Sequence, residues 1–419
     1  MGSNYKPIGN YIQLVDERNK GLKVTSLLGL SISKQFIKSV ANTIGTDMEN
    51  YKIISKNQFA CSTMQVRRDK KMPVALYSED APSIISQAYP IFEIINTKEL
   101  LPEYLMMWFT RSEFDREACF HAVGGVRGSL EWEDFCGMKL PIPSPQKQRE
   151  IVKEYHTLVN RIALNNQLIS KLEETAQAIY KQWFVDFEFP DENGKPYKSN
   201  GGKMIWCQEL EKEIPEGWEY NNFGNLVETI NGYPFKSEDF NQKGICPIIK
   251  IKNIKAPYVY IQSDTQYYND KISSNLQKLT ANKGDLLISM TGSGANQLNS
   301  AVGQVGKYYY KSIALINQRV CKLLPKKDFY NEFVFQFIAS PEIQTELLNG
   351  STGSANQANI SPNQIKDLKT LMPDENTLKI YSKIASSIDN FKSLEMIDKL
   401  EELKELLLAK MTKVEEYQY

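Results

Sequence analysis

The feature of this sequence that most constrains its fold is an internal repeat. Residues 171–174 (KLEE) recur as residues 399–402, an offset of 228. Four further landmark pairs keep offsets between 227 and 231: Lys56 and Lys283, Gln87 and Gln318, Ser112 and Ser340, and Pro143 and Pro373. One match of four residues carries little weight, but a series of offsets confined to this narrow range indicates a true repeat. We therefore predict that the chain is built twice from one plan.

The clearest local pattern follows each copy, where apolar residues recur in steps of three and four. In the first arm this seam is unbroken, and Asn165 is its single polar member. The seam positions are Ile151, Tyr155, Leu158, Ile162, Asn165, Ile169, Leu172, Ala176, Ile179 and Trp183. Such spacing is typical of a coiled coil, in which one polar seam residue fixes the register. The second arm has a broader apolar face, from Ile384 to Leu407.

Each lobe has a mixed α and β pattern. Strand-like runs lie at residues 51–54, 73–77, 285–289 and 305–310, and short helices are expected at 102–109 and 330–338. Ser361 before Pro362 predicts a helix start. Residues 9–12 resemble residues 224–227 at an offset of 215, so the second lobe holds about a dozen extra residues before Lys283. The predicted segments are a first lobe at 1–145, a central helix at 146–185, a linker at 186–215, a second lobe at 216–375 and a C-terminal helix at 376–419.

Cysteine and histidine content argues against a metal site. The six cysteines lie far apart without a CxxC pair, and His121 and His156 are the only histidines. We therefore expect neither zinc nor disulfides, as in a reducing compartment. The first 20 residues lack a signal-peptide core, and no stretch reaches the roughly 20 apolar residues of a spanning helix. The expected location is the cytoplasm, away from the membrane.

No catalytic motif can be found. A DNA-base methyltransferase needs a Gly-rich cofactor loop and an Asn/Asp-Pro-Pro-aromatic clamp, and an ATPase needs GxxxxGK[ST]; none of these occurs. Pro190-Asp191 and Pro373-Asp374 resemble metal-nuclease carboxylates only superficially, because both are loop sequence without a strand-borne Glu-x-Lys. We expect no catalytic residue and no metal ligand in this chain.

DNA contact has better candidates, although the formal net charge is zero. They lie in the basic stretch 67–71, the segment 250–253, the polar loop 291–299, and two Gly-rich loops, 124–129 and 350–359, at equivalent places in the repeat. The candidate residues are Arg67, Arg68, Lys70, Lys71, Arg127, Lys250, Lys252, Asn253, Ser293, Asn296, Gln297, Asn299, Asn356 and Gln357. Arg and Lys suit phosphates and guanine, and Asn and Gln suit adenine. Each place has an alternative reading, as a solvated loop, a strand with a polar outer face, a flexible connection or a structural turn.

Three segments together resemble one known family. They are residues 140–152 (LPIPSPQKQREIV), residues 172–187 with their ending YKQWFVDF, and residues 214–218 (IPEGW). The chain resembles the specificity subunits of type I restriction-modification systems over essentially its whole length. The resemblance implies an α+β fold of two target-recognition lobes, joined by two long helices that form an antiparallel coiled coil with pseudo-two-fold symmetry.

The resemblance also implies a mechanism without chemistry in this chain. Each lobe would read one half of a bipartite double-stranded DNA target. Two methyltransferase subunits would dock on the arms and lobes, and restriction (motor-nuclease) subunits would join them. S-adenosylmethionine, ATP and Mg²⁺ would then act through those partners. Two other classes remain open: a stand-alone or fused endonuclease, which needs a metal-carboxylate site, and a coiled-coil protein scaffold, which needs no DNA.

Overall fold

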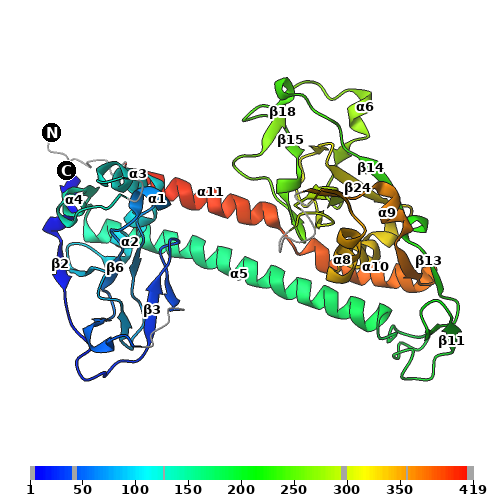
Figure 1. Ribbon diagram of the computed structural model, residues 1–419, viewed down its shortest axis with the longest axis horizontal. Helices are drawn as coiled ribbons and strands as arrows, with labels where there is room; N and C mark the ends of the chain where they lie inside the picture. Colours follow the sequence, from blue (N-terminus) through cyan, green and yellow to red (C-terminus); the bar gives the residue numbers. More distant parts are fainter. Residues whose placement is uncertain (1–4, 40–44, 126–127, 294–299, 355–356, 413–419) are drawn as a thin grey trace. The chain divides into compact units, whose positions relative to one another are not determined.

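The computed structural model describes residues 5–39, 45–125, 128–293, 300–354 and 357–412 (Figure 1). The chain divides into two compact units. The first unit contains residues 1–163 together with 399–419, and the second contains residues 164–398. Helices and sheets are mixed in both, as the sequence predicts.

The first unit contains two four-stranded sheets. The central sheet is antiparallel and has the order β2 (Ile12–Val15), β9 (Ile91–Ile94), β6 (Phe59–Cys61), β7 (Val74–Leu76). The second sheet has the order β4 (Phe36–Lys38), β3 (Leu27–Leu30), β8 (Ser83–Ile85), β5 (Lys52–Ile54), and β3 runs parallel to β8. Three helices follow, α2 (Pro102–Thr110), α3 (Ser112–His121) and α4 (Trp132–Gly137), and β10 (Lys139–Pro141) pairs with β1 (Tyr5–Pro7).

The second unit repeats this topology. Its central sheet begins β14 (Val227–Asn231), β24 (Val320–Pro325), β20 (Leu286–Ser289), β22 (Val305–Lys307). Its other sheet has the order β18 (Gln266–Tyr268), β15 (Cys246–Ile249), β23 (Ala314–Ile316), β19 (Thr280–Ala281), again with one parallel pair. The helices are α7 (Asn331–Ile338), α8 (Pro341–Asn349) and α9 (Pro362–Asp367), and β27 (Lys369–Met372) pairs with β13 (Glu219–Asn222). Ser361 caps α9 by accepting the N–H of Gln364, as predicted.

Between β15 and β18 the second unit has a longer connection than the first unit has between β3 and β4. Residues 31–35 connect β3 to β4 in the first unit, whereas residues 250–265 connect β15 to β18 in the second. The longer connection holds β16 (Ile254–Lys255) and β17 (Tyr258–Val259), which extend the central sheet beyond β22. The extra residues that the repeat offsets require therefore lie here.

The arms consist of α5 (Pro145–Phe184), α10 (Glu375–Asn390) and α11 (Leu394–Lys410) (Figure 1). Every seam residue of α5 is buried or half-buried. In the first unit Ile151 shares a core with Leu408 and Met411, and in the second unit Ile169 packs with Leu394. The second arm differs from its prediction, because it is two helices with a break between Asn390 and Leu394 instead of one continuous helix.

Residues 186–215 also differ from their prediction as a linker. Phe187, Phe189 and Ile214 are buried in the main core of the second unit, and Phe189 stacks on Trp218 with ring centroids 5.0 Å apart. In the same segment β11 (Met204–Cys207) pairs with β12 (Lys212–Pro215). The Gly-, Pro- and Lys-rich centre is polar, but aromatic residues on its flank bury enough apolar surface to hold the segment in place.

Candidate DNA interface

In the first unit the basic stretch and the Gly-rich loop, predicted separately, lie together. The stretch forms one short helical turn, α1 (Val66–Asp69). Arg67 Nη1 donates to the carbonyl oxygen of Gly124 at 3.2 Å. Gly128 has φ +44°, and a Cβ there would lie 2.8 Å from the Arg67 Cβ. The close approach of the two segments therefore requires a glycine at 128.

The charges of the basic stretch are not equally available. Arg68 makes two hydrogen bonds to Asp69, at 2.7 and 3.1 Å. Arg67, Lys70 and Lys71 are exposed. A cation that is already paired has less to offer a phosphate, so Lys70 and Lys71 are the better candidates for backbone contact.

A buried ion pair anchors the end of this stretch. The Met72 N–H donates to Asp115 Oδ1 at 3.1 Å, and Lys34 Nζ contacts the same oxygen at 2.8 Å. Burial lowers the pKa of Lys34, while the hydrogen bond and charge of Asp115 oppose that shift. Because Asp115 lies on α3, the basic stretch is tied to a helix at its far end.

The second unit brings its two polar loops together in a similar way. β21 (Thr291–Gly292) pairs with β26 (Gln357–Asn359), which pairs with β25 (Thr352–Ser354). The Ile360 N–H donates to the Met290 carbonyl at 3.0 Å, and at the equivalent place in the first unit the Leu130 N–H donates to the Thr63 carbonyl at 2.9 Å. In both units, therefore, the loop that follows β6 or β20 in the central sheet contacts the loop that precedes the last short helix, α4 or α9.

The candidate residues in these loops differ in exposure and in hydrogen bonding. Gln357 is exposed, and its Nε2 donates to Asn359 Oδ1 at 3.3 Å. Ser293 is half-buried, and its carbonyl accepts from Ser300 Oγ at 2.6 Å. The remaining loop candidates lie outside the described residues: Arg127, Asn296, Gln297, Asn299 and Asn356.

The prediction for Asn253 is wrong. This residue is fully buried. Its side-chain amide donates to the Tyr260 carbonyl and to Thr265 Oγ1, both at 2.9 Å, and its Oδ1 accepts from the Lys250 N–H at 2.9 Å. All its hydrogen bonds are internal, so Asn253 holds the longer connection together and offers nothing to a base.

The lysines beside Asn253 are also engaged. Lys250 Nζ lies 3.6 Å from the centre of the Phe240 ring and donates to Gln266. Lys252 is exposed but pairs with Asp264 at 2.6 Å. The segment is a 3-10 turn, Ile251–Asn253, instead of an alternating strand. The polar residues of this segment therefore belong to a turn, and their side chains bond to other residues of the second lobe.

One exposed aromatic residue beside the basic stretch was missed. Phe120 is 80% exposed near the end of α3. The neighbouring Cys119 thiol donates to the Val66 carbonyl at 3.4 Å, which places this end of α3 beside α1. Helical periodicity could have indicated this exposure. The buried Phe114 and Ala118 define one face of α3, and Phe120 does not lie on that face.

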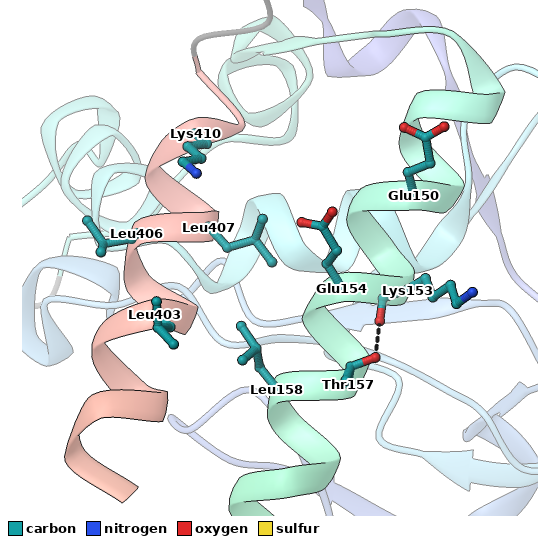
Figure 2. A pocket seen from close by; sticks show the side chains of 9 residues that line it. All are labelled: Glu150, Lys153, Glu154, Thr157, Leu158, Leu403, Leu406, Leu407 and Lys410. Atoms are coloured by element: carbon teal, nitrogen blue, oxygen red, sulfur yellow. Dashed lines mark hydrogen bonds between the residues drawn. The ribbon is translucent and has the colours of Figure 1, made fainter. Parts of the chain in front are cut away.

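A second surface lies on the arms within the first unit. α5 and α11 enclose an open groove of about 640 Å³ whose floor is formed by Leu158, Leu403 and Leu407 (Figure 2). Leu403 and Leu406 are 50% and 52% exposed. Charged residues line the rim: Glu150, Lys153, Glu154 and Lys410. An exposed apolar groove with a polar rim is typical of a protein-binding surface.

Among the described residues there is no group of three or more His, Cys, Asp or Glu side chains that could hold a metal ion. In the same part of the chain, no helix is long and apolar enough to cross a membrane.

Comparison with known proteins decides the family. A family model of the type I restriction modification DNA specificity domain matches residues 29–174 and 215–405. The chain belongs to the type I restriction modification DNA specificity family. Its two matched regions follow the repeat, one in each copy. The resemblance noted in residues 140–152, 172–187 and 214–218 is thereby confirmed.

Individual members of the specificity family are distant relatives. The HindI specificity subunit of Haemophilus influenzae is 21% identical over 78% of this chain and 80% of its own length. The MjaIX specificity subunit of Methanocaldococcus jannaschii is 26% identical over 38% of this chain, and the match spans only 35% of that relative. A solved S subunit from M. genitalium, 13% identical, has the same fold, with a TM-score of 0.59 over 97% of this chain and 95% of that one.

Proposed function

We propose that this chain is the specificity subunit of a type I restriction-modification complex, and that each lobe reads one half of a bipartite double-stranded DNA target. The observation that carries the proposal is the repeated pairing of loops. Two units of the same topology each bring two polar loops together at the same place in the fold. Two similar surfaces on one chain suit a target of two short half-sites.

Partners complete the proposed complex. Two methyltransferase subunits dock on the arms and lobes, and restriction subunits join for cleavage. The groove between α5 and α11 supports a protein partner on the arms. S-adenosylmethionine, ATP and Mg²⁺ are used by those partners. The chain acts in the cytoplasm, which the six free cysteines support.

The two long arms form an antiparallel coiled coil with pseudo-two-fold symmetry in this proposal. Its support is the order of contacts within each unit. In the first unit the beginning of α5 packs with the end of α11, and in the second unit a later part of α5 packs with the start of α11. That order is expected when two helices run in opposite directions.

Exchanging one lobe tests the proposal. Residues 1–140 are replaced with the matching lobe of a relative, and the variant is expressed with the methyltransferase subunit that it serves. Sequencing of methylated DNA should show a new first half-site and an unchanged second half-site. Both halves changing together would contradict separate reading by the two lobes.

The rival functions predict other results. An endonuclease would cleave DNA by itself and stop when a chelator is added. A protein scaffold would need no DNA. The affinity of such a protein for duplex DNA would depend on salt no more than the affinity of an unrelated protein does.

A further inference from the structure

A set of buried and half-buried charged groups lies where the second arm is interrupted. α10 ends at Asn390 and α11 begins at Leu394, and Lys392 between them is 3% exposed. Its Nζ lies 2.8 Å from Glu173 Oε1 on α5 and 3.4 Å from Asp389 Oδ1 on α10. The break in the second arm thus places a cation between two carboxylates.

Further ion pairs link these groups to the second lobe. Asp389 Oδ2 lies 3.3 Å from Nζ of Lys307, a fully buried residue of β22. Lys307 also contacts both carboxylate oxygens of Glu332 on α7, at 2.7 and 2.8 Å. Tyr309 donates to Asp389 Oδ1. One arm helix is therefore joined to a strand and a helix of the lobe.

Glu173 also connects these charged groups to β17, in the longer connection of the second lobe. Tyr258 of β17 donates its hydroxyl to Glu173 Oε1 at 2.8 Å, so β17 is tied to α5. Burial, reinforced by nearby carboxylates, raises the pKa of both Tyr258 and Tyr309. Both phenols therefore keep their protons at neutral pH and remain donors.

Such a cluster fixes the orientation of the second lobe on the arm helices as well as its distance from them. Apolar contacts tolerate sliding and rotation, whereas hydrogen bonds between ions hold only in a narrow range of geometry. Each buried charge must stay paired, because an unpaired charge in the interior costs several times more than the pair contributes. Any rotation of the lobe on α5 and α10 would break several of these pairs at once.

The first copy of the repeat lacks the two lysines of this cluster at the equivalent positions. Strand register places Leu76 where the second copy has Lys307, because Leu76 pairs with Phe59 of β6 as Lys307 pairs with Leu286 of β20. The repeat offset of 228 places Leu164 where the second copy has Lys392. Both cations of the cluster are therefore leucines in the first copy.

From these contacts we infer that Tyr258, Glu173, Lys392, Asp389 and Lys307 are positioning residues that hold the second lobe in one orientation on the arm helices. The inference rests on the proposed function in one respect: a fixed orientation lets the second half-site be read at one set spacing. It also predicts that a foreign second lobe works only if the matching charges on α5 and the second arm come with it.

A distance measurement tests the orientation directly in the full-length chain. Spin labels on genetically encoded residues at Gln177 of α5 and Lys278 of the second lobe, both exposed, report the spread of distances between lobe and helix. Lys392→Met should broaden the distribution at least twofold. Adding Glu173→Gln should narrow it again, because it removes the carboxylate left without its cation. Lys379→Met, which removes an exposed ion pair on α10, should leave the width unchanged.

The outcomes separate the inference from its alternatives. A folded Lys392→Met chain with the wild-type width would overturn it. If that variant does not fold, Tyr258→Phe decides alone, since it removes one hydrogen bond without leaving a buried charge: a broader distribution supports the inference and an unchanged one refutes it.

Methylation supplies the second readout. With the methyltransferase subunit present, Lys392→Met should add sites whose half-site spacing differs by one base pair, and the double variant with Glu173→Gln should reduce them. A variant that broadens the distances but keeps one spacing contradicts the role in reading. A wild-type chain that directs no bipartite methylation contradicts the proposed function instead, and the distance result is unaffected.

Discussion

Lys70 and Lys71 lie exposed just after α1, whereas the neighbouring Arg68 is held by Asp69. Replacing both lysines with alanine should weaken binding to every duplex and lower the slope of log affinity against log salt by about 0.9 for each phosphate that the protein no longer neutralises. Filter binding at several salt concentrations measures the slope. Lys98→Ala, another exposed lysine in the same lobe, is the matched control. An unchanged slope in the double variant would mean that the basic stretch is only a solvated loop.

Asn253 is expected to matter for stability and not for DNA. Asn253→Ala leaves the Lys250 N–H, the Tyr260 carbonyl and Thr265 Oγ1 without this partner. A buried polar group left unsatisfied costs about 1–3 kcal/mol. The midpoint of urea unfolding should fall accordingly, with faster hydrogen exchange in residues 250–265. Lys252→Ala, which breaks only an exposed ion pair, should cost less than about 1 kcal/mol. Equal effects of the two changes would refute the buried role of Asn253.

At the scale of elements, the loop pair of the first unit depends on one glycine. Gly128→Ala should force the Gly-rich loop away from α1, since the added Cβ would meet the Arg67 side chain and φ is +44°. Backbone strain of this kind costs about 1–3 kcal/mol. Gly125→Ala is the control, because a Cβ there has open space.

The measurement for this pair is binding to DNA altered in one half-site at a time. Gly128→Ala should reduce discrimination at the first half-site and leave the second as it was, and Gly125→Ala should leave both. Wild-type discrimination at both half-sites in the Gly128 variant would separate the loop pair from DNA reading.

For the whole molecule, we predict no chemistry from this chain alone. Incubated with duplex DNA, S-adenosylmethionine, ATP and Mg²⁺, it should transfer no methyl group and cut no strand, because the cofactor and nucleotide loops are missing from its sequence. Radiolabelled methyl transfer and gel analysis of plasmid DNA measure both reactions. Adding the methyltransferase subunit should start methylation. Turnover that follows this chain through purification would refute the assignment as a specificity subunit.

Several features could be read from the sequence because they depend on neighbours along the chain. The seam of α5 follows from apolar steps of three and four residues, and the start of α9 from Ser361 reaching the N–H of Gln364. The repeat is visible because both copies keep the same landmarks. Together with the motif at residues 140–152, it was enough to recognise the family.

Other features needed the tertiary structure, because their partners lie far apart in the chain. Lys392 lies in the break of the second arm and pairs with Glu173 of α5, and an apolar face counted along one helix cannot show that. Asn253 is buried, and its amide is bonded to Tyr260 and Thr265, which lie 7 and 12 residues further along the chain. The basic stretch at 67–71 and the Gly-rich loop are joined into one candidate surface by the hydrogen bond from Arg67 to Gly124, 57 residues further along the chain. Periodicity determines which residues face inward, whereas strand pairing across the fold decides which of them meet.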